Sequence, residues 1–596
     1  MRGAAISPAR RALVVLGAIL TAVVFAAAGG ASHGSDPEIT VGSNDNVFSQ
    51  NKQNEPTVSI NPLNPLQVGA GANDNLDLEA CNVGADNTCP FTDGVGVTGF
   101  QASTNGGASW VQPTYTGWTA RHCLGAPGPG DTCTPAVGPI GTVPWYFENG
   151  LVADGDPVQA WGPRRGANGQ FSWTNGARLY FANLTSNFSA QRDEQTFKGF
   201  EAIGVSRTDN FAAAAAGVQT AWLPPVIASK QRSAALFSDK EWIVADDAAT
   251  SPFFGNVYIC NASFRSVGLG GAPEPILFAR STDGGDSWQS KQLTSAANTG
   301  LGQGRQGCVV QTDSDGVVYV FWSSAAKQKT NPPFFDSAQL MTRSFDGGVS
   351  FERPRVVAPV QDCGLFDEAT GRLSFDGIAG ARTNSFPSVD IANAAPLGTG
   401  ATDVIVMTWC DGPTPSVTTP GANEQALVQM SFDKGVTWTA PVNAAEAGDR
   451  PDFPAIAVSP DGTDVYLVYM AFTAPWQTTA AAPRLMQGVV RHANITGGTL
   501  GAFTTMHRGA LGDARGSSQN NLAAEFLGDY NDIRATNDFA FAVWNDVRQA
   551  SDCPAIDTWR LSRLTTPSPA PAPQISCAPT FGNSDIWGTR IDDPTP

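Results

Sequence analysis

The sequence predicts an all-β protein built from repeated antiparallel sheets, and three observations support this. A turn motif of fixed spacing occurs four times, beginning at Ser103, Ser281, Ser344 and Ser431. Gly (63) and Pro (42) are abundant among the 596 residues, and only 15% of the residues are charged. Val, Ile, Thr, Phe and Trp recur in short bursts without a long helical period, which is typical of short strands joined by turns.

The turn motif places Ser first, Asp or Asn two residues later, Gly two further on and an aromatic residue three beyond that. The Asp or Asn side chain can cap the amides of the turn, Gly can take a positive φ, and the aromatic ring returns to the core. Three copies share this pattern in full and the copy from Ser344 ends in Phe351: Ser103, Asn105, Gly107 and Trp110; Ser281, Asp283, Gly285 and Trp288; Ser431, Asp433, Gly435 and Trp438. The motif resembles the Asp-box, or bacterial neuraminidase repeat, of sialidase-like β-propellers, where it has a structural role away from the central pocket.

Seven repeat units can be drawn along the chain, each a small antiparallel sheet. They open near Glu55, Gly155, Asp239, Cys308, Phe386, Asp452 and Gly528. Such sheets cannot bury both faces alone, and radial packing solves this. We therefore predict a β-propeller of four-stranded antiparallel blades. Seven blades are expected, and six, the number that the resemblance implies, is the alternative, because the first or last unit could merge into one blade closed by both termini.

The N-terminus has the layout of a secretory signal peptide, which we assign to residues 1–31. Arg2, Arg10 and Arg11 precede an apolar run from Ala12 to Ala28 that ends among small residues. We expect a secreted monomer, with residues 32–596 forming a single propeller domain, and an uncleaved membrane anchor as the alternative. The low Lys content and the bias toward Gly, Ala and Pro are typical of a bacterial protein.

The ten cysteines all lie beyond this segment, and an even number in an exported chain predicts disulfides. Pairing of neighbours along the chain gives Cys81 with Cys89, Cys123 with Cys133, Cys260 with Cys308, Cys363 with Cys410, and Cys553 with Cys577. The net charge of −18 argues against nucleic-acid binding, which relies on clustered Lys and Arg. No cofactor is certain, although some carboxylates could bind Ca²⁺.

Acidic residues occupy similar places at the openings of five units: Glu55, Asp156, Asp239, Asp452 and Asp529. Similar strand registers would direct these side chains toward one axis. Converging carboxylates can bind a cation, share protons with raised pKa values, or bind sugar hydroxyls. Alternatively, each acid caps its own turn.

Arg305, Arg382 and Arg450 precede the inner strands of three adjacent units at matching positions, and three guanidinium groups could clamp one carboxylate. Sialidases are similar in using three arginines on the substrate carboxylate, a Tyr nucleophile activated by Glu, and an Asp as acid or base. This resemblance implies Tyr530 as nucleophile, with Glu525 nearby, and Asp239 or Asp529 in acid and base work. The family's N-terminal Arg-Ile-Pro motif is replaced here by NEPTVS.

Two functions are therefore expected. One is a secreted propeller that binds extracellular glycans or proteins through its mouth or through its long insertions, which are Cys81 to Cys89, Cys123 to Cys133 and Asp362 to Arg382. The other is a glycoside hydrolase of the exo-α-sialidase type that acts on acidic sugars. Neither a GxSxG elbow nor an HExxH helix is present, which disfavours serine hydrolase and zinc protease chemistry.

Overall fold

The computed structural model describes residues 36–83, 89, 91–126, 133–188, 201–229, 236–265, 273–296, 303–328, 334–412, 424–479, 481–566 and 568–595. The chain separates into two units, Met1–Gly34 and Ser35–Pro596, and the described residues belong to the second. The signal peptide assigned to residues 1–31 lies outside them. No helix among the described residues is long and apolar enough to cross a membrane.

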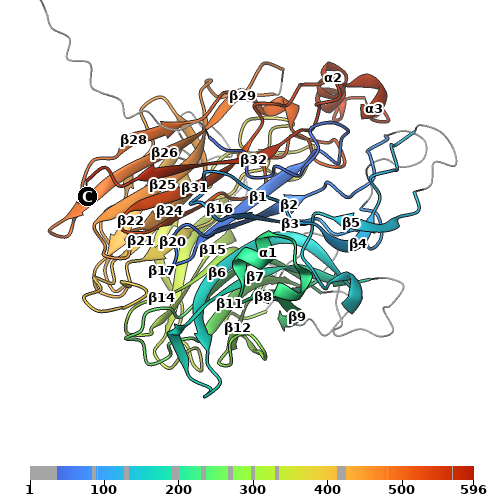
Figure 1. Ribbon diagram of the computed structural model, residues 1–596. Helices are drawn as coiled ribbons and strands as arrows, with labels where there is room; N and C mark the ends of the chain where they lie inside the picture. Colours follow the sequence, from blue (N-terminus) through green and yellow to red (C-terminus); the bar gives the residue numbers. More distant parts are fainter. Residues whose placement is uncertain are drawn as a thin grey trace, which may run out of the picture. The chain divides into compact units, whose positions relative to one another are not determined.

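Seven antiparallel sheets follow one another along the chain (Figure 1). The first and last have three strands, the sixth has six, and the others have four. The strands of the first three sheets are β1 (Gln53–Ile60), β2 (Val68–Asp74), β3 (Thr98–Ser103); β6 (Leu151–Arg165), β7 (Phe171–Asn187), β8 (Ala202–Thr208), β9 (Trp222–Ser229); β10 (Phe237–Ala245), β11 (Val257–Phe264), β12 (Ile276–Ser281) and β13 (Gln289–Gln292).

The remaining four sheets occupy the second half of the chain. Their strands are β14 (Gln303–Thr312), β15 (Val318–Gln328), β16 (Phe334–Ser344), β17 (Arg355–Val360); β20 (Ser388–Ile391), β21 (Ile405–Asp411), β22 (Gln425–Ser431), β23 (Val442–Asn443); β24 (Arg450–Val458), β25 (Asp464–Phe472), β26 (Leu485–Thr496), β27 (Thr499–Leu500), β28 (Thr504–Arg508), β29 (Gly512–Asp513); β30 (Asp532–Ala535), β31 (Phe539–Asp546) and β32 (Asp585–Asp592).

The seven sheets form a closed ring. The first strand of each sheet contacts the first strand of the next, in the order β1, β6, β10, β14, β20, β24 and β30, and β30 in turn contacts β1. Each blade therefore buries both faces against its neighbours, as β25 shows, since every one of its residues is buried. The predicted all-β propeller with seven blades is confirmed, and the alternative of six is wrong.

Both ends of the described chain contribute to the last blade. Glu38 forms an antiparallel bridge with Trp587 of β32, and the Ile39 N–H donates to the Ile586 carbonyl at 2.8 Å. The N-terminal segment thus pairs with the edge of the three-stranded sheet. This closure explains why the repeat count does not fall to six: the termini share a seventh blade.

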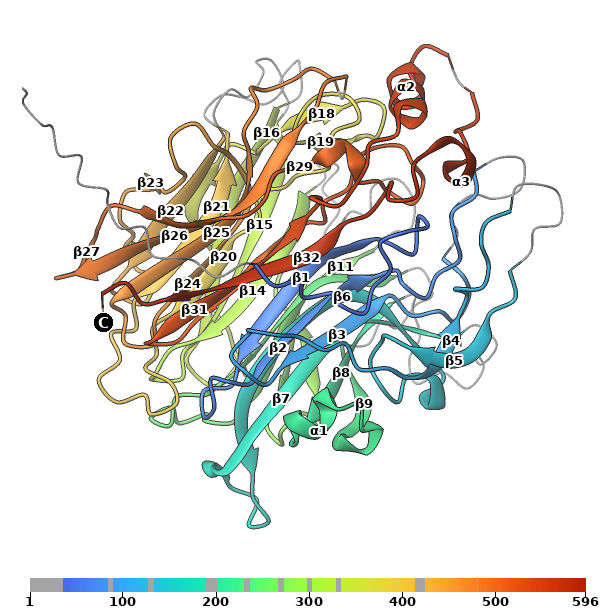
Figure 2. The ribbon, with the colours of Figure 1, turned by 45° about the horizontal axis from the view of Figure 1, so that its top comes forward.

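Segments outside the blades form two hairpins and short helices. The hairpins are β4 (Tyr115–Thr119) with β5 (Ala136–Ile140), and β18 (Leu365–Asp367) with β19 (Arg372–Ser374); the helices are η1 (Phe147–Asn149), α1 (Phe211–Ala215), η3 (Gln219–Ala221), η4 (Ala514–Gly516), α2 (Pro554–Ser562) and α3 (Pro573–Ser576). Figure 2 shows β18, β19, β29 and α2 near one another at one end of the ring.

The four recurring turns are structural, as the motif predicts. In the third blade, the Ser281 hydroxyl accepts from the Gly285 N–H at 2.9 Å, and Asp283 Oδ1 accepts from the Ser287 N–H at 2.9 Å. The turn then packs on the preceding blade, where Arg178 Nη1 donates to the Gly284 carbonyl at 2.8 Å. The same arginine-to-carbonyl contact recurs at the next two turns, from Arg280 to Gly347 and from Arg343 to Lys434.

All five predicted disulfides are present: Cys81–Cys89, Cys123–Cys133, Cys260–Cys308, Cys363–Cys410 and Cys553–Cys577. The Cys260–Cys308 bond joins β11 to β14, so it links the third blade covalently to the fourth. The Cys553–Cys577 bond links α2 to α3.

Candidate functional site

The inner strands share a β-bulge near their first residues. In β1, β6, β10, β14 and β24 the pairing with the second strand shifts, and one residue there takes a positive φ. These residues are Glu55 (58°), Asp156 (50°), Lys240 (49°), Gly307 (64°) and Phe453 (47°). Bulges turn the side chains that flank them away from the regular strand alternation.

The bulge shows that the acidic residues aligned at the openings of the units differ in position by one residue. Glu55 and Asp156 occupy the positive-φ position itself, whereas Asp239 and Asp452 come one residue before it. The acids are therefore not strictly equivalent, although three of them still meet.

Three carboxyl groups from adjacent blades lie together at this end of the ring. The carboxyl of Asp156 hydrogen-bonds with those of both Glu55 and Asp239. Burial, followed by the negative charge of Asp156, raises the pKa of Glu55 and of Asp239 well above their ordinary values. Adjacent carboxyls repel when both ionise, so Glu55 and Asp239 retain their protons to a higher pH than isolated carboxyls do.

Arg382 joins this group to a fourth acid. Its Nε and Nη2 bond Asp529 Oδ1 and Oδ2 at 2.7 and 2.6 Å, and Nη2 also lies 3.1 Å from Glu55 Oε1. The guanidinium packs over the ring of Phe526, 4.5 Å from its centroid, and its side chain is 25% exposed. We name Glu55, Asp156, Asp239 and Asp529 the carboxyl cluster; the sequence predicted all four, and Arg382 with them.

Several polar groups beside the carboxyl cluster are buried without a partner. Lys240 Nζ lies 3.5 Å from the centroid of the Tyr530 ring, and the Tyr530 hydroxyl has no hydrogen bond to any described residue. Both oxygens of Glu241 are likewise buried without a bond from another described residue. Burial, then the charge of Asp156, raises the pKa of Glu241 and of Tyr530. Such unsatisfied groups are unfavourable for folding and are common at functional sites.

Tyr530 and Glu525, which the sequence suggested as a pair, have different partners. Glu525 Oε2 accepts from Arg484 Nη1 at 3.0 Å, in a contact that is wholly buried. The ammonium group of Lys240 faces the Tyr530 ring. A role of Tyr530 as nucleophile stays a prediction.

A cavity of about 560 Å³ opens beside Arg382. Its lining combines four basic side chains with aromatic and amide groups, and it includes no Asp or Glu from the described residues: Lys52, Cys89, Phe91, Ala369, Thr370, Arg372, Arg382, Gln519, Asn520, Asn521, Ala523, Phe526 and Arg563. In a chain with 54 acidic and 36 basic residues, this lining is unusual. We name it the mouth pocket. An anion is the ligand that such a lining favours.

Lys52 lies at the inner wall of the mouth pocket. Its Nζ donates to Asn520 Oδ1 and lies 5.0 Å from the centroid of the Phe526 ring. Burial, opposed by the charge of Glu55, lowers the pKa of Lys52 to about 7. An anion placed beside this amine would favour its charged form.

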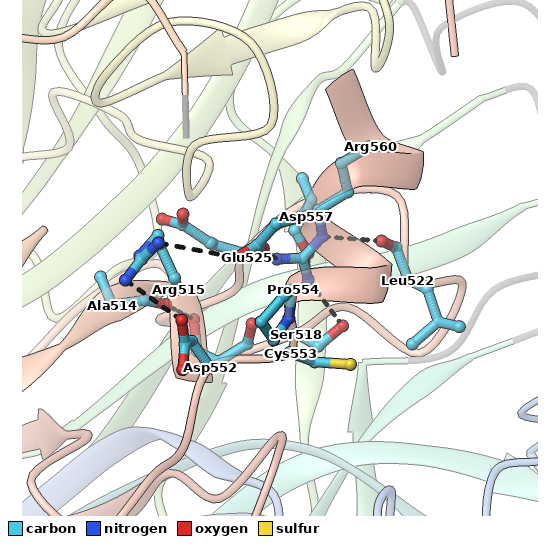
Figure 3. A network of polar contacts seen from close by, with 12 residues as sticks. Ala514, Arg515, Ser518, Leu522, Glu525, Asp552, Cys553, Pro554, Asp557 and Arg560 are labelled. Carbon is cyan, nitrogen blue, oxygen red and sulfur yellow. Dashed lines mark hydrogen bonds and ion pairs between the residues drawn. The ribbon is translucent and has the colours of Figure 1, made fainter. Parts of the chain in front are cut away.

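Helix α2 supports the wall of the mouth pocket from behind. The guanidinium of Arg560, 1% exposed, donates to the Leu522 carbonyl and to Ser518 Oγ, both at 2.9 Å (Figure 3). Arg515 pairs with Asp552 at 3.2 Å in the same network. These bonds fix the backbone of the segment that carries Asn520 and Phe526 into the pocket.

The other predicted site residues lie in separate contacts. Arg450 is buried between Glu424 and Asp376, at 2.9 Å from each, and the Arg305 N–H donates to Glu274 Oε2 at 2.9 Å. Asp452 accepts from the Thr383 hydroxyl at 2.6 Å. Burial raises the pKa of Asp452 well above its ordinary value. That the three arginines clamp one anion stays a prediction, and each has a carboxylate neighbour of its own.

Sequence reasoning identified Arg382 and the insertion from Asp362 to Arg382 that carries Arg372, but it did not identify the remaining basic and aromatic residues of the mouth pocket. Lys52 directly precedes β1, and Arg372 lies in the β18–β19 hairpin. Phe526 lies in a loop, and Arg563 follows α2. None of these places is a repeated position that the comparison of units could reveal. Only Lys52, three residues before Glu55, lay within the compared strand openings.

No protein-family model matches the chain, and no curated protein matches it by sequence. Solved structures do. A Hadza microbial sialidase aligns at 11% identity over 70% of this chain and 63% of its own, with a TM-score of 0.35. A Trypanosoma rangeli sialidase in complex with the inhibitor DANA aligns at 11% identity over 78% of this chain and 58% of its own, with a TM-score of 0.34.

A Penicillium chrysogenum alpha-L-arabinanase complexed with arabinobiose aligns at 10% identity over 73% of this chain and 92% of its own, with a TM-score of 0.35. The chain thus spans less than two thirds of the length of both sialidases. What the site can do follows from its own side chains.

Proposed function

We propose that this protein is an exported propeller that binds acidic glycans in the mouth pocket. The observation that carries the proposal is the lining of that pocket by Lys52, Arg372, Arg382 and Arg563, with no carboxylate of the described residues among its lining. Such a surface would attract a sugar that carries a carboxylate more strongly than it would attract a neutral sugar.

Arg382 is prepared for this role. Asp529 and Glu55 bond its Nε and Nη2, while its Nη1 donates to no described residue, and a quarter of the side chain is exposed. A guanidinium held on one edge in this way presents its remaining N–H groups in a fixed direction, which reduces the ordering that binding requires. Arg372 is exposed beside it and forms no ion pair within the described part of the chain.

The pocket also suits a sugar ring. Phe91 and Phe526 offer aromatic faces, and Gln519, Asn520 and Asn521 offer amide groups that can both donate and accept. A cavity of about 560 Å³ is large enough for a small saccharide unit. The ligand could be free or carried on an extracellular glycoprotein.

A second function, hydrolysis of an acidic glycoside, is favoured by the carboxyl cluster beneath Arg382. The raised pKa of Asp239, which burial and the charge of Asp156 cause, is the direction of shift that a general acid requires. Asp529, partly exposed and bonded to Arg382, would then be the second carboxyl group of the pair. In this case Tyr530 or Asp529 attacks the anomeric carbon while Asp239 protonates the leaving oxygen, so the glycosidic bond breaks as the bond to the enzyme forms. Water then cleaves the glycosyl-enzyme bond and returns a proton to Asp239.

A glycan array and a turnover assay together test the proposal. The wild-type protein should bind sialosides or uronic-acid glycans above their neutral counterparts, and Arg382→Ala should lose this preference. Arg534→Ala serves as the matched control, because Arg534 lines a different cavity of about 320 Å³. Equal binding of acidic and neutral glycans, or retention by Arg382→Ala, contradicts the proposal.

Incubation with a fluorogenic sialoside and with uronic-acid glycosides separates the two functions. Release that Asp239→Asn abolishes supports the hydrolase. Saturable binding without release supports a binding protein, and release that persists in Asp239→Asn excludes that residue as the acid.

A further inference from the structure

The seam where the N-terminal segment joins the last blade holds a group of three carboxylates. Glu38 and Asp45 come from the N-terminal segment and Asp585 from the first residue of β32. One oxygen from each lies within 4.8 Å of the others. This group, which we name the seam carboxylates, is separate from the carboxyl cluster.

No basic side chain of the described residues forms an ion pair with the seam carboxylates. Arg548, whose charge acts on Glu38, is paired instead with Asp36 at 2.9 Å and with Asp546 at 2.7 Å. Three negative groups this close together, without a counter-charge, are strongly unfavourable unless a cation or protons neutralise them.

Asp585 provides an independent indication of a ligand. Its side chain is 1% exposed, and its Oδ2 accepts from Asn583 Nδ2 at 3.1 Å. Its Oδ1 has no hydrogen-bond partner among the described residues. A carboxylate oxygen that is fully buried and unpartnered loses its hydration without compensation, which a bound cation would restore. Asn583 Oδ1 is also buried and likewise has no hydrogen-bond partner among the described residues.

We propose that Glu38, Asp45 and Asp585 bind a calcium ion that fastens the N-terminal segment to β32. The donors are all oxygens, which excludes a site of the zinc type with Cys or His ligands. Ca²⁺ accepts six to eight oxygens in irregular arrangements, and water can complete the set at the partly exposed Glu38 and Asp45. Mg²⁺ needs a near-octahedral set and gives up its waters reluctantly, so it fits this seam less well.

The position gives the ion a structural consequence. The ring is closed here by the pairing of Glu38 with Trp587 and of Ile39 with Ile586. Two ligands lie on one side of that pairing and one on the other, so the bound ion opposes separation of the two ends of the ring. Because a ligand that binds only the folded state stabilises it by mass action, stability should rise with Ca²⁺ concentration.

A second acidic group in the molecule serves as a control. Asp464, His492 and Asp593 also place one ligand atom each within 4.8 Å of one another. There, however, Asp464 Oδ1 already bonds His492 Nε2 at 2.8 Å and Asn494 Nδ2 at 3.1 Å. These contacts account for that group without an ion.

Calorimetric titration of the full chain, after treatment with a chelator, tests the proposal. We expect one Ca²⁺ per chain, a rise in the unfolding temperature with Ca²⁺, and a smaller effect of Mg²⁺. Asp585→Asn should weaken Ca²⁺ binding by about 100-fold, while Asp593→Asn should leave it unchanged. If Asp585→Asn does not fold, the partly exposed pair Glu38→Gln and Asp45→Asn gives the same test.

Terbium luminescence provides a readout at the site itself. Trp587, paired with Glu38, should sensitise bound Tb³⁺, and Trp587→Phe should remove the emission but keep Ca²⁺ binding. The absence of saturable Ca²⁺ uptake, or uptake that survives Glu38→Gln with Asp45→Asn, would overturn the assignment.

Discussion

Carboxylates at the outer turns of the ring and carboxylates at its axial end have pKa values shifted in opposite directions. In the fifth blade's turn, hydrogen bonds from the Thr437 side chain and N–H lower the pKa of Asp433. At the inner end, burial and the charge of Asp156 raise the pKa of Glu55 and Asp239. One set receives several donors; the other is crowded with like charge.

The difference separates a folding role from a chemical one. Each outer turn repeats the same hydrogen bonds within the chain, and these bonds satisfy its polar side chains without a ligand. The inner end repeats only the bulge, and its side chains differ from blade to blade, with groups such as Glu241 and the Tyr530 hydroxyl left without partners. Contacts that repeat from blade to blade therefore stabilise the ring. Positions whose side chains differ between blades are the candidates for a functional site.

The largest expected effect concerns Arg382. Arg382→Ala removes the guanidinium that bonds Glu55 and Asp529, so the free energy of unfolding at pH 7.5 should fall by about 3 kcal/mol. The loss should shrink near pH 5, because burial raises the pKa of Glu55 and this carboxyl is then protonated. Chemical denaturation at both pH values measures it.

The outer arginine Arg343 is the comparison for this variant. It bonds Glu352 and the Lys434 carbonyl at the rim. Arg343→Ala should lose about 1 kcal/mol, with little dependence on pH in this range. Equal losses in the two variants would remove the distinction between rim and axis.

The second effect is steric and belongs to the rim. A Cβ on Gly107 would lie 2.0 Å from Phe541 Cε2, at a φ of +88°. Gly107→Ala should therefore lower the free energy of unfolding by about 3 kcal/mol without changing ligand affinity. Gly498 also has a positive φ, +77°, but meets nothing within 4 Å, so Gly498→Ala should lose only about 1 kcal/mol. A similar loss in both variants means that packing against Phe541 contributes nothing.

The sequence predicted the rim better than the axis for the same reason. Turn bonds are local, so Ser, Asp and Gly at fixed spacing determined the four turns. Pairing of neighbouring cysteines along the chain identified the disulfides, including two whose cysteines are separated by 48 and 47 residues in the sequence. Glu55, Asp156 and Asp239 were found because they share strand openings. The partners of Arg305 and Arg450 could not be found, since Glu274 and Glu424 lie outside the repeated positions. Arg372 and Phe526 come from insertions, whose placement depends on tertiary contacts such as those of Arg560.

The third expected effect is a mutation at the axis that raises the free energy of unfolding instead of lowering it. Because the pKa of Asp239 is raised above its ordinary value of 3.8, the folded state holds its proton over a range where the unfolded state has lost it. Its contribution to stability is therefore present at low pH and declines as pH rises above about 4. Asp239→Asn keeps an acceptor for Gln306 but cannot ionise, so at pH 7.5 it should be about 1 kcal/mol more stable than the wild type.

Unfolding curves of Asp239→Asn and wild type between pH 4 and 8 test this. The two should converge near pH 4 and separate above it. A variant that is less stable at pH 7.5 would show that Asp239 is ionised and satisfied in the folded protein.

The smallest effect concerns the rim carboxylate Asp346. Burial opposes the change, but hydrogen bonds from the Ser350 side chain and N–H lower its pKa to about 2. Its contribution is thus present above the ordinary value of 3.8 and is lost as pH falls toward 2. Asp346→Asn should lose about 1 kcal/mol at pH 7 and nothing near pH 2. Asn105, which holds the same turn in the first blade, explains why the loss stays small.

The central claim, that the mouth pocket recognises a carboxylate-bearing sugar through Arg382, is tested most directly by one pair of affinities. Calorimetric titration should compare a sialoside with the same molecule whose carboxylate is converted to a neutral carboxamide. The account predicts that the carboxylate form binds about 100-fold more tightly, and that Arg382→Ala removes most of this difference while Arg534→Ala does not. Equal affinities of the two forms for the wild-type protein would contradict it.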